Sequence, residues 1–526
     1  MNKDINQDPN LDPNQDSNQD KNQGLNEGLN QISDQNQDQN QDQNLQNYQP
    51  KSGHTLAFAI MSLLGAFLFL VPIPDGEGAF NIPLGFAINW LGENLNSIEI
   101  NGFGLVVLMA MVVISISFIG SALAYVARPD FIMENEKLRN LFLCHPVYFV
   151  SKTIAVILGW MVYFAGNFGE EFIESMDWLI GGDGAGLMTM LISEGGSNLM
   201  TIFIILGFAI PILTDFGFME FLGILIRKCV RALFTLPGRS SIDLLGSWFS
   251  SSAASVIITR DQLERGYYTG REAAAICVNF TLVSLPFTFV VAGTAGVLPY
   301  FPMFYLVICV TAILLAIVMP RIWPLRGIKD EYLPDVGKQI VEDVPPDMST
   351  FSWAVKLASK RASQTTPESV IRSGFSNWLN IFMDLIPVIM AWGTIALVIQ
   401  ATTPIFDYLS LPFAFILGLF QVQYIVEYPP GYYVNFAPAT VVGFADMFIP
   451  AVLLGAQDAY ENFVAPLQTR FILGALSIVQ IIYMAETGIL ILKSKIPLNI
   501  GHLAIIFVMR TVFALPVIIL LTWLLL

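Results

Sequence analysis

Polar side chains interrupt two stretches of the sequence that are otherwise apolar enough to lie in a membrane. Residues 246–258 read GSWFSSSAASVII and contain a dense patch of hydroxyls, on Ser250, Ser251, Ser252 and Ser255. Residues 443–456 read GFADMFIPAVLLGA and contain one acid, Asp446. Because an ionisable group at membrane depth costs about 2.5–3.5 kcal/mol, each such group is a candidate site residue. The Asp446 carboxylate could hold a cation, exchange a proton or accept hydrogen bonds from a solute.

Further candidates lie at the start of these stretches or on the spans that follow them. They are Gly246, Gly443, Asn279, Gln480 and Glu486. Glu486 is either a coupling carboxylate or a surface glutamate near the end of its helix. Hydroxyls in a broken helix can replace the water shell of a solute, but they also allow helices to approach closely. Asp446 has an alternative role too, since Asp is a preferred N-cap for a following half-helix.

The elements that must position these residues are membrane-spanning helices. The chain has 526 residues, of which 54% are hydrophobic and 13% charged, whereas a soluble chain is usually about 25% charged. Runs without charge approach the length of about 20 residues that a spanning helix needs, and they recur from Thr55 to the C-terminus. The alternation of basic loops with loops lacking Lys and Arg accommodates about nine spans if the N-terminus is cytoplasmic. The predicted fold class is therefore an all-α polytopic membrane protein.

The segments 240–258 and 437–456 differ from the predicted spans. They are only moderately apolar, rich in Ser, Gly and Ala, and broken by Gly or Pro. Non-helical backbone is tolerated at membrane depth only where it is buried in protein or lines a water-filled cavity. This composition predicts two re-entrant or broken helices.

The second half of the chain repeats a pattern found in the first half. Residues 210–217 (IPILTDFG) match residues 386–393 (IPVIMAWG), with an Ile-Pro pair and a glycine at the same spacing. Each match is followed by a broken segment and then by an arginine that opens the next span, Arg271 or Arg470. The basic loops give the two halves opposite orientations. Such inverted repeats are typical of secondary transporters, whose sites lie near mid-membrane where broken helices meet.

At these residues the sequence resembles the nucleoside-recognition, or Gate, domain superfamily, and within it the YjiH family of bacterial inner-membrane proteins. The segment GSWFSSSAASVIITRDQLERGYYTGREAAAI is similar to the Gate segment of the ferrous-iron transporter B. The segment GFADMFIPAVLLGA is similar to the re-entrant GFAN segment of concentrative nucleoside transporters, with Asp446 where that family has Asn. The chain has no GxxxxGK[ST] motif, so GTP-driven iron uptake is not implied. The carboxylate at Asp446 leaves open whether this residue contacts a nucleoside.

The resemblance and the composition together predict five parts of the chain. The first, rich in Asn, Gln and Asp, has almost no apolar surface to offset the entropy of ordering and is expected to be disordered. The predicted parts are the disordered tail at 1–50, N-terminal transmembrane segments at 51–198, a first Gate-like repeat at 199–320, a cytoplasmic linker at 321–375 and a second Gate-like repeat at 376–526.

Other classes of protein are disfavoured by charge and by motif content. A net charge of −16 argues against nucleic-acid binding, which needs a basic face. The four cysteines form no CxxC pair and no HExxH motif occurs, so neither a metal site nor an enzyme is expected, and no cofactor is predicted. The predicted partners are membrane lipids and a small polar solute, with H+ or Na+ as a candidate co-substrate. A homo-oligomer is compatible with the sequence.

The leading hypothesis is a secondary transporter or permease of the Gate type in the bacterial plasma membrane. It would move a small polar solute, and the resemblance favours a nucleoside-like one. The alternative is a membrane scaffold or signalling component of the spore-maturation type, because membership of the superfamily does not by itself establish transport. A polar cavity between the two broken segments would favour the transporter, and a dry, packed junction would favour the scaffold.

The topology predicts that residues 321–375 face the cytoplasm, because loops rich in Lys and Arg stay on the cytoplasmic side of the membrane. In a variant without native cysteines, a cysteine at Ser363 should resist a membrane-impermeant thiol reagent in intact cells. The same cysteine should react after the cells are permeabilised. Labelling of equal strength before and after permeabilisation would invert the predicted orientation.

Overall fold

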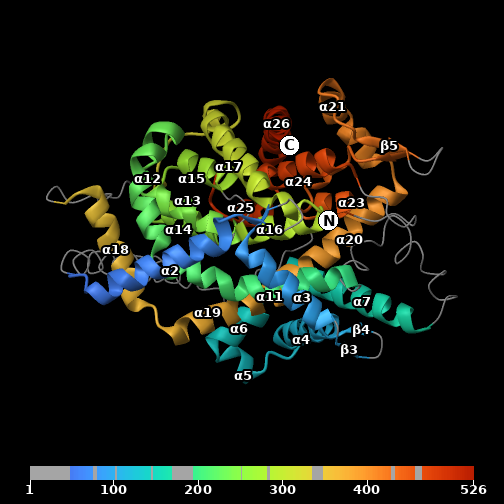
Figure 1. The fold of residues 1–526 in the computed structure, drawn as a ribbon, viewed down its shortest axis with the longest axis horizontal. Coiled ribbons are helices and arrows are strands. Elements are labelled where there is room, and N and C mark those ends of the chain that lie inside the picture. Colours follow the sequence, from blue (N-terminus) through green and yellow to red (C-terminus); the bar gives the residue numbers. More distant parts are fainter. Residues whose placement is uncertain are drawn as a thin grey trace, which may run out of the picture.

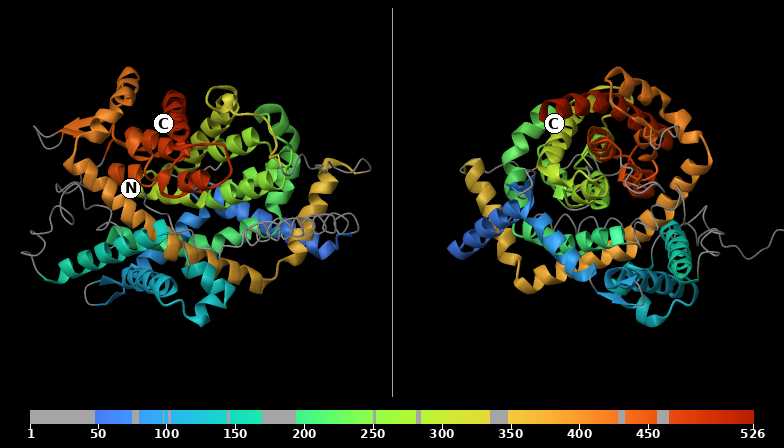
Figure 2. Two further views of the ribbon diagram at one scale, coloured as in Figure 1. Left: turned by 180° about the vertical axis from the view of Figure 1, so that it is seen from behind. Right: turned by 45° about the vertical axis from the view of Figure 1, so that its right-hand side comes forward.

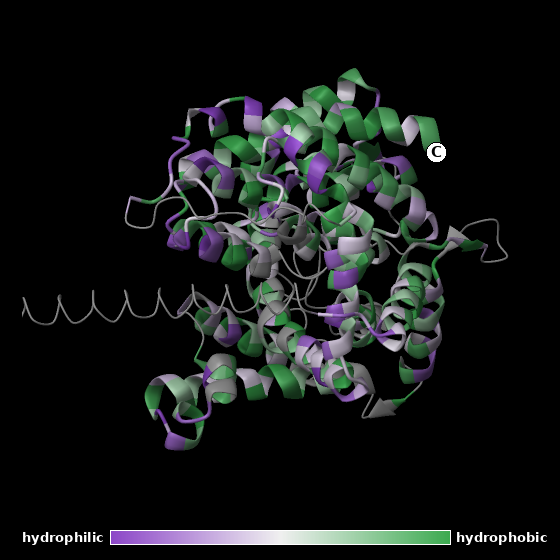
Figure 3. Ribbon diagram, turned by 90° about the vertical axis from the view of Figure 1, so that its left-hand side faces the viewer, coloured by the Kyte–Doolittle hydropathy of each residue, from purple (hydrophilic) through white to green (hydrophobic). Residues whose placement is uncertain are grey.

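The computed structural model describes residues 48–74, 80–96, 98–100, 103–143, 146–168, 194–249, 252–280, 285–334, 348–427, 433–455 and 465–526. This part of the chain is mostly helical, as predicted (Figure 1). Its strands form three short antiparallel pairs: β1 (Ile73–Pro74) with β2 (Phe80–Asn81), β3 (Glu99–Ile100) with β4 (Phe103–Gly104), and β5 (Ile425–Glu427) with β6 (Tyr433–Asn435). Apolar residues occupy long stretches of most helices (Figure 3).

The N-terminal helices lie together at one side of the molecule (Figures 1 and 2). They are α2 (Ser52–Leu70), α3 (Pro83–Asn96), α4 (Leu105–Val126), α5 (Asp130–Met133), α6 (Glu136–Phe142) and α7 (Pro146–Phe168). Buried hydroxyls connect them to the second half of the chain: Ser117 donates to the carbonyl of Met383, and Ser151 accepts from the indole of Trp392. These helices therefore support the second half directly.

The described residues of the first predicted repeat, and the three-residue turns that follow its last helix, are mostly helical. The elements of this region are α11 (Glu194–Thr214), α12 (Phe218–Phe234), α13 (Ser240–Phe249), α14 (Ser252–Glu264), α15 (Gly270–Asn279), α16 (Leu285–Thr294), η2 (Leu298–Tyr300), α17 (Phe301–Val318), η3 (Met319–Arg321) and η4 (Leu325–Gly327).

The remaining elements lead from the linker to the C-terminus. They are α18 (Thr350–Gln364), α19 (Pro367–Asn380), the π-turn η5 (Ile381–Leu385), α20 (Ile386–Thr402), α21 (Ile405–Leu419), α22 (Ala439–Val442), α23 (Ile449–Gly455), α24 (Leu467–Gln480), the π-turn η6 (Met484–Gly488), α25 (Ile489–Lys493) and α26 (Ile500–Leu525). The C-terminal elements α22 to α26 lie beside α13 to α17 of the first repeat (Figures 1 and 2).

Of the two segments predicted to be broken, the second is interrupted in the structure, and the middle of the first falls outside the described residues. The first consists of α13 and α14, and the residues between them lie outside the described part of the chain. The second consists of the short helices α22 and α23, which are joined by turns at 443–448. Each is followed by a helix that ends in the protein interior, α15 after the first and α24 after the second. The two regions share this order of elements.

The prediction of about nine spans is not confirmed. In the described part of the chain, four helices are long and apolar enough to cross a membrane: Ser52–Phe69, Leu298–Gly327, Pro367–Gln400 and Ile500–Leu525. A fifth is counted if Thr201–Thr214 and Phe218–Phe234, which meet at a bend of 59°, form one broken span. Shorter apolar helices cover Met111–Val126, Tyr148–Met161 and Ile405–Leu419. One apolar run, 471–485, contains a break in the structure, because α24 ends at Gln480 and Ile481 has a φ of +66°.

The predicted tail lies outside the described residues, except for its last three positions. One of these, Tyr48, donates from its hydroxyl to the carbonyl of Ser359 on α18, over 3.2 Å. This contact ties the start of the described chain to the linker helix.

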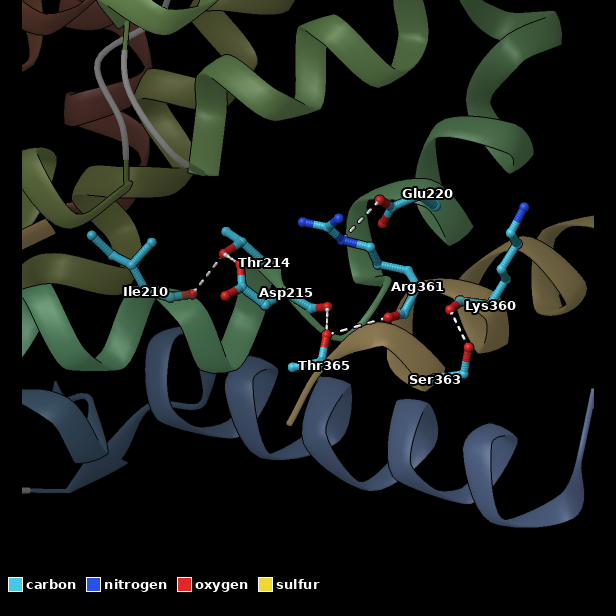
Figure 4. Close-up of polar contacts among 8 residues, drawn as sticks. All are labelled: Ile210, Thr214, Asp215, Glu220, Lys360, Arg361, Ser363 and Thr365. Atoms are coloured by element: carbon cyan, nitrogen blue, oxygen red, sulfur yellow. Dashed lines mark hydrogen bonds and ion pairs between the residues drawn. The ribbon is translucent and has the colours of Figure 1, made fainter. Parts of the chain in front are cut away.

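The linker helix α18 docks on the bend between α11 and α12, as Figure 4 shows. Thr365, which directly follows α18, donates from its hydroxyl to the carbonyl of Asp215 over 2.7 Å. The Nε atom of Arg361 lies 3.7 Å from a carboxylate oxygen of Glu220. Asp215 directly follows α11 and Glu220 lies in the first turn of α12, so these two acids mark the helix ends at the bend.

Gly217 allows the close approach of α18 to this bend. Its φ is +95°, and an added Cβ would lie 2.7 Å from the Cα of Ala358. A side chain at Gly217 would therefore need both a left-handed backbone, which costs about 1–2 kcal/mol for a residue other than glycine, and a displacement of α18.

We expect Gly217→Ala to lower the melting temperature of the purified protein by several degrees. Gly53→Ala is the matched control, because a Cβ at Gly53 would meet nothing within 4 Å. Differential scanning fluorimetry in detergent would compare the two variants with the wild type. Equal melting temperatures for all three proteins would show that the docking of α18 does not contribute to stability.

Candidate functional site

The side chain of Gln480 lies at the end of α24, inside the second repeat. It is only 1% exposed. Its Nε2 donates to the carbonyl of Thr440 over 2.7 Å and to the hydroxyl of Thr511 over 2.8 Å. Its Oε1 atom is buried and has no hydrogen-bond partner among the described residues. The amide is therefore held in one orientation with a free acceptor.

Gly443, which follows α22, provides the space for this amide. An added Cβ at Gly443 would lie 2.7 Å from Oε1 of Gln480, closer than such contacts occur. Only a glycine at this position allows the broken segment to lie against the free acceptor of Gln480. The structure thus brings together two of the predicted site residues.

Asp446 lies in the same turn, between α22 and α23, and is 4% exposed. Its Oδ1 accepts the backbone N–H of Phe448 over 2.8 Å, immediately before α23 begins. The interaction is of the Asx-turn type, which fits the capping alternative. No ion pair of Asp446 is found among the described residues, and a burial of this degree is unusual for an unpaired aspartate. The side chain of Phe448, two residues further on, packs edge-on against Phe287 of α16.

The backbone after Gln480 leaves the helical conformation abruptly. Ile481 has a φ of +66°, which is rare for a β-branched residue and costs about 1–3 kcal/mol. The N–H of Met484 then donates to the carbonyl of Phe444 over 2.8 Å, so the break pairs with the turn that contains Asp446. Strain of this kind concentrates at functional sites.

Glu486 lies beyond this break, in the π-turn η6. One of its carboxylate oxygens accepts the hydroxyl of Tyr483 over 3.0 Å. The side chain is half-buried, so it is neither a fully exposed surface glutamate nor enclosed as Asp446 is.

The hydroxyl patch of the first repeat is described only in part. Ser250 and Ser251 lie outside the described residues, and only the backbone of Ser252 is placed. Ser255 is buried on α14, and its Oγ has no hydrogen-bond partner among the described residues. Gly246 lies within α13, where an added Cβ would be 3.6 Å from the side chain of Met219, so no close approach requires a glycine there.

The two segments predicted to be broken pack against elements of the other half of the chain. Helix α14 contacts η6 and α25, and α16 contacts α23. Asp446 lies in the turn before α23, and Glu486 lies in η6, so both lie near these contacts between the two halves.

Asn279, at the end of α15, is bonded within the protein. Its Nδ2 donates to the carbonyl of Ala275 over 2.9 Å, and its Oδ1 accepts NH1 of Arg510 over 2.9 Å. Both ends of the amide are engaged, so its role in this structure is to hold Arg510.

Arg510 is a residue that sequence reasoning misses, because an arginine in an apolar helix is most simply expected to snorkel or to pair at the membrane interface. In the structure its side chain is instead 0% exposed. The sequence contains the signal that identifies it, because Arg510 is the tenth residue after Ile500 in a 26-residue apolar helix and thus lies about 15 Å along it. A charge at that depth is a site candidate.

These features define a helical, multi-pass membrane protein. Residues 197–298, which run from α11 to α16, match the family model described as nucleoside recognition (Gate). The chain is 39% identical over 465 residues to an uncharacterized protein of Alkalihalophilus pseudofirmus, a match that covers 88% of this chain and 93% of that protein. The chain therefore belongs to the family of that protein.

Two solved structures of CNTnw resemble the fold weakly. A double variant in an outward-facing state has a TM-score of 0.35 and 14% identity, covering 80% of this chain and 96% of that one. A substrate-bound, inward-facing state has a TM-score of 0.35 and 15% identity, covering 89% and 98%.

The geometry predicts different effects for two glycine substitutions. Gly443→Ala should displace the Gln480 amide and lower the melting temperature, because the methyl group and Oε1 cannot occupy the same space. Gly246→Ala should leave the melting temperature nearly unchanged, since its methyl group meets only an ordinary contact. Thermal unfolding of both variants checks this, and equal stability of the two would contradict the close approach of Gln480 to Gly443.

Proposed function

We propose that the protein is a secondary transporter for a small polar solute, with nucleosides as the class to test first. The observation that carries the proposal is the buried Oε1 of Gln480, which has no hydrogen-bond partner in the part of the chain that the structure describes. It lies beside Gly443, in contact with a broken segment that also contains Asp446. An unmade hydrogen bond at a buried acceptor costs about 1–3 kcal/mol. A solute that donates a hydrogen bond would recover this energy.

The chemistry at this position suits a solute rich in N–H and O–H donors. Gln480 offers an amide oxygen, and Asp446 offers a carboxylate, which accepts stronger hydrogen bonds than a neutral group. Ser255 adds a buried hydroxyl in the first repeat. The amino and hydroxyl groups of a nucleoside would match acceptors of these kinds, and the match of residues 197–298 to the nucleoside-recognition model supports this class.

The order of elements supports alternating access between two related halves. A broken pair is followed by a helix that ends inside the protein in both regions, and each pair packs on the helix after the other break. Secondary transporters place substrate sites where such discontinuous helices meet. An inverted relation between the halves, with 199–320 and 376–526 as the two repeats and 321–375 as a cytoplasmic linker between them, is part of the proposal.

A non-transporting scaffold is the second candidate. The observation that favours it is the tight packing around α15 and α24, where Asn279 and Arg510 are fully engaged with protein partners. A scaffold needs no solute, so a screen of purified protein for thermal stabilisation by nucleosides, nucleobases, amino acids and ions separates the two. Stabilisation by one solute class, followed by its uptake into proteoliposomes, is the expected result for a transporter.

Two roles of Asp446, ion coupling and helix capping, predict different results when its charge is removed. Asp446→Asn should abolish ion-dependent uptake while the protein still folds, because it removes the charge and keeps the hydrogen bond to Phe448. Asp446→Ala should in addition weaken solute binding. Uptake by proteoliposomes with and without Na+ and with a pH gradient would measure both effects.

Glu368→Gln is the control for loss of a carboxylate elsewhere, because Glu368 pairs with Arg372 at the exposed surface of α19. This variant should transport like the wild type. Wild-type uptake and ion dependence in Asp446→Asn would contradict the coupling role and leave capping, for which Asn is as suitable as Asp.

A further inference from the structure

Arg510 joins the ends of two helices that are far apart in the sequence. Its Nε and NH2 donate to the carbonyl of Val479 over 3.1 Å and 2.7 Å. Its NH1 donates to the carbonyl of Val278 over 3.0 Å, besides the bond to Asn279. Val278 is the next-to-last residue of α15, and Val479 is the next-to-last residue of α24. One guanidinium thus bonds a backbone carbonyl at the end of each helix.

The environment of this cation contains no carboxylate partner among the described residues. No ion pair of Arg510 is found there, and its hydrogen bonds all run to carbonyl or amide oxygens. The C-terminus of a helix carries about half of a negative elementary charge. The ends of α15 and α24 together therefore provide about one negative elementary charge, which balances the single positive charge of Arg510.

The neighbouring residue on α26 strengthens the same junction. Thr511 accepts a hydrogen bond from Nε2 of Gln480, the last residue of α24. Both helices end on a valine followed by an amide residue, and α26 contacts both amides through Arg510 and Thr511. The junction therefore belongs equally to the two repeats.

Carbonyl oxygens at the ends of broken helices are the groups with which secondary transporters hold coupling cations. We propose that the Arg510 guanidinium is a built-in cation at this junction, which occupies the carbonyls of Val278 and Val479 and so excludes a metal cation from them. The inference rests on the proposed transporter function where it concerns coupling. Any ion that the cycle uses must then bind elsewhere, and Asp446, the buried acid between α22 and α23, could take it.

Neutralising Arg510 should convert the junction into a cation site. In Arg510→Gln the shorter, neutral side chain leaves carbonyl oxygens of two helix ends without a positive partner. Arg510→Lys keeps the charge, and its ammonium can still bind carbonyls. The two variants therefore differ in charge at the same buried position.

The experiment measures the melting temperature of the full-length protein in detergent, in NaCl and in N-methyl-D-glucamine chloride of equal ionic strength. For each protein the readout is the difference between its melting temperatures in the two salts. In the wild type this difference includes any effect of Na+ at Asp446. We expect this difference to be several degrees larger in Arg510→Gln than in the wild type, and unchanged in Arg510→Lys. Guanidinium ion at low, non-denaturing concentration should stabilise Arg510→Gln in the same way as Na+.

Three outcomes would overturn the inference. One is an Arg510→Gln variant whose response to Na+ and guanidinium equals that of the wild type, and another is an Arg510→Lys variant that gains the same response. The third is failure of both variants to fold in either salt. If Arg510 acts only as a positive charge beside carbonyl oxygens, a lysine should be able to replace it. None of these readouts needs a transported solute, so the inference and the proposed transport function can fail separately.

Discussion

Two helices of this protein, α15 and α24, end inside the molecule, where water cannot satisfy their last carbonyl groups. A helix leaves four carbonyls without intrahelical partners, and at membrane depth each unsatisfied group is costly. Arg510 satisfies one of these carbonyls at each end with one planar group, because its donors reach the carbonyls of Val278 and Val479 together.

The candidate site is built on the same junction. Gln480 is the last residue of α24, and its amide is oriented by Thr511, the neighbour of Arg510 on α26. The backbone then turns sharply at Ile481 and pairs with the turn that contains Asp446. The free acceptor of Gln480 and the buried carboxylate thus have their positions set by the long C-terminal helix, not by the broken segment alone.

The linker packs against a different part of the molecule, the bend between α11 and α12. Helix α18 seals the bend between α11 and α12 through Gly217, Thr365 and the Arg361–Glu220 pair (Figure 4). The pair is partly exposed, and such pairs contribute little energy, whereas the close backbone contact at Gly217 is sensitive to a single methyl group. Packing, more than charge, holds the linker against the first repeat.

The sequence by itself determined the helical membrane class, the interruption of 437–456 and the candidates Gly443, Asp446 and Gln480, because apolar length, breaker residues and polar groups at depth are local properties. The number of spans could not be read in the same way, since a break such as the one after Gln480 leaves the composition unchanged. Only the tertiary structure decided that Asn279 holds Arg510, and that the Arg510 side chain is fully buried. Its partners are carbonyls, which every residue carries, so their identity depends on which helix ends the fold brings together.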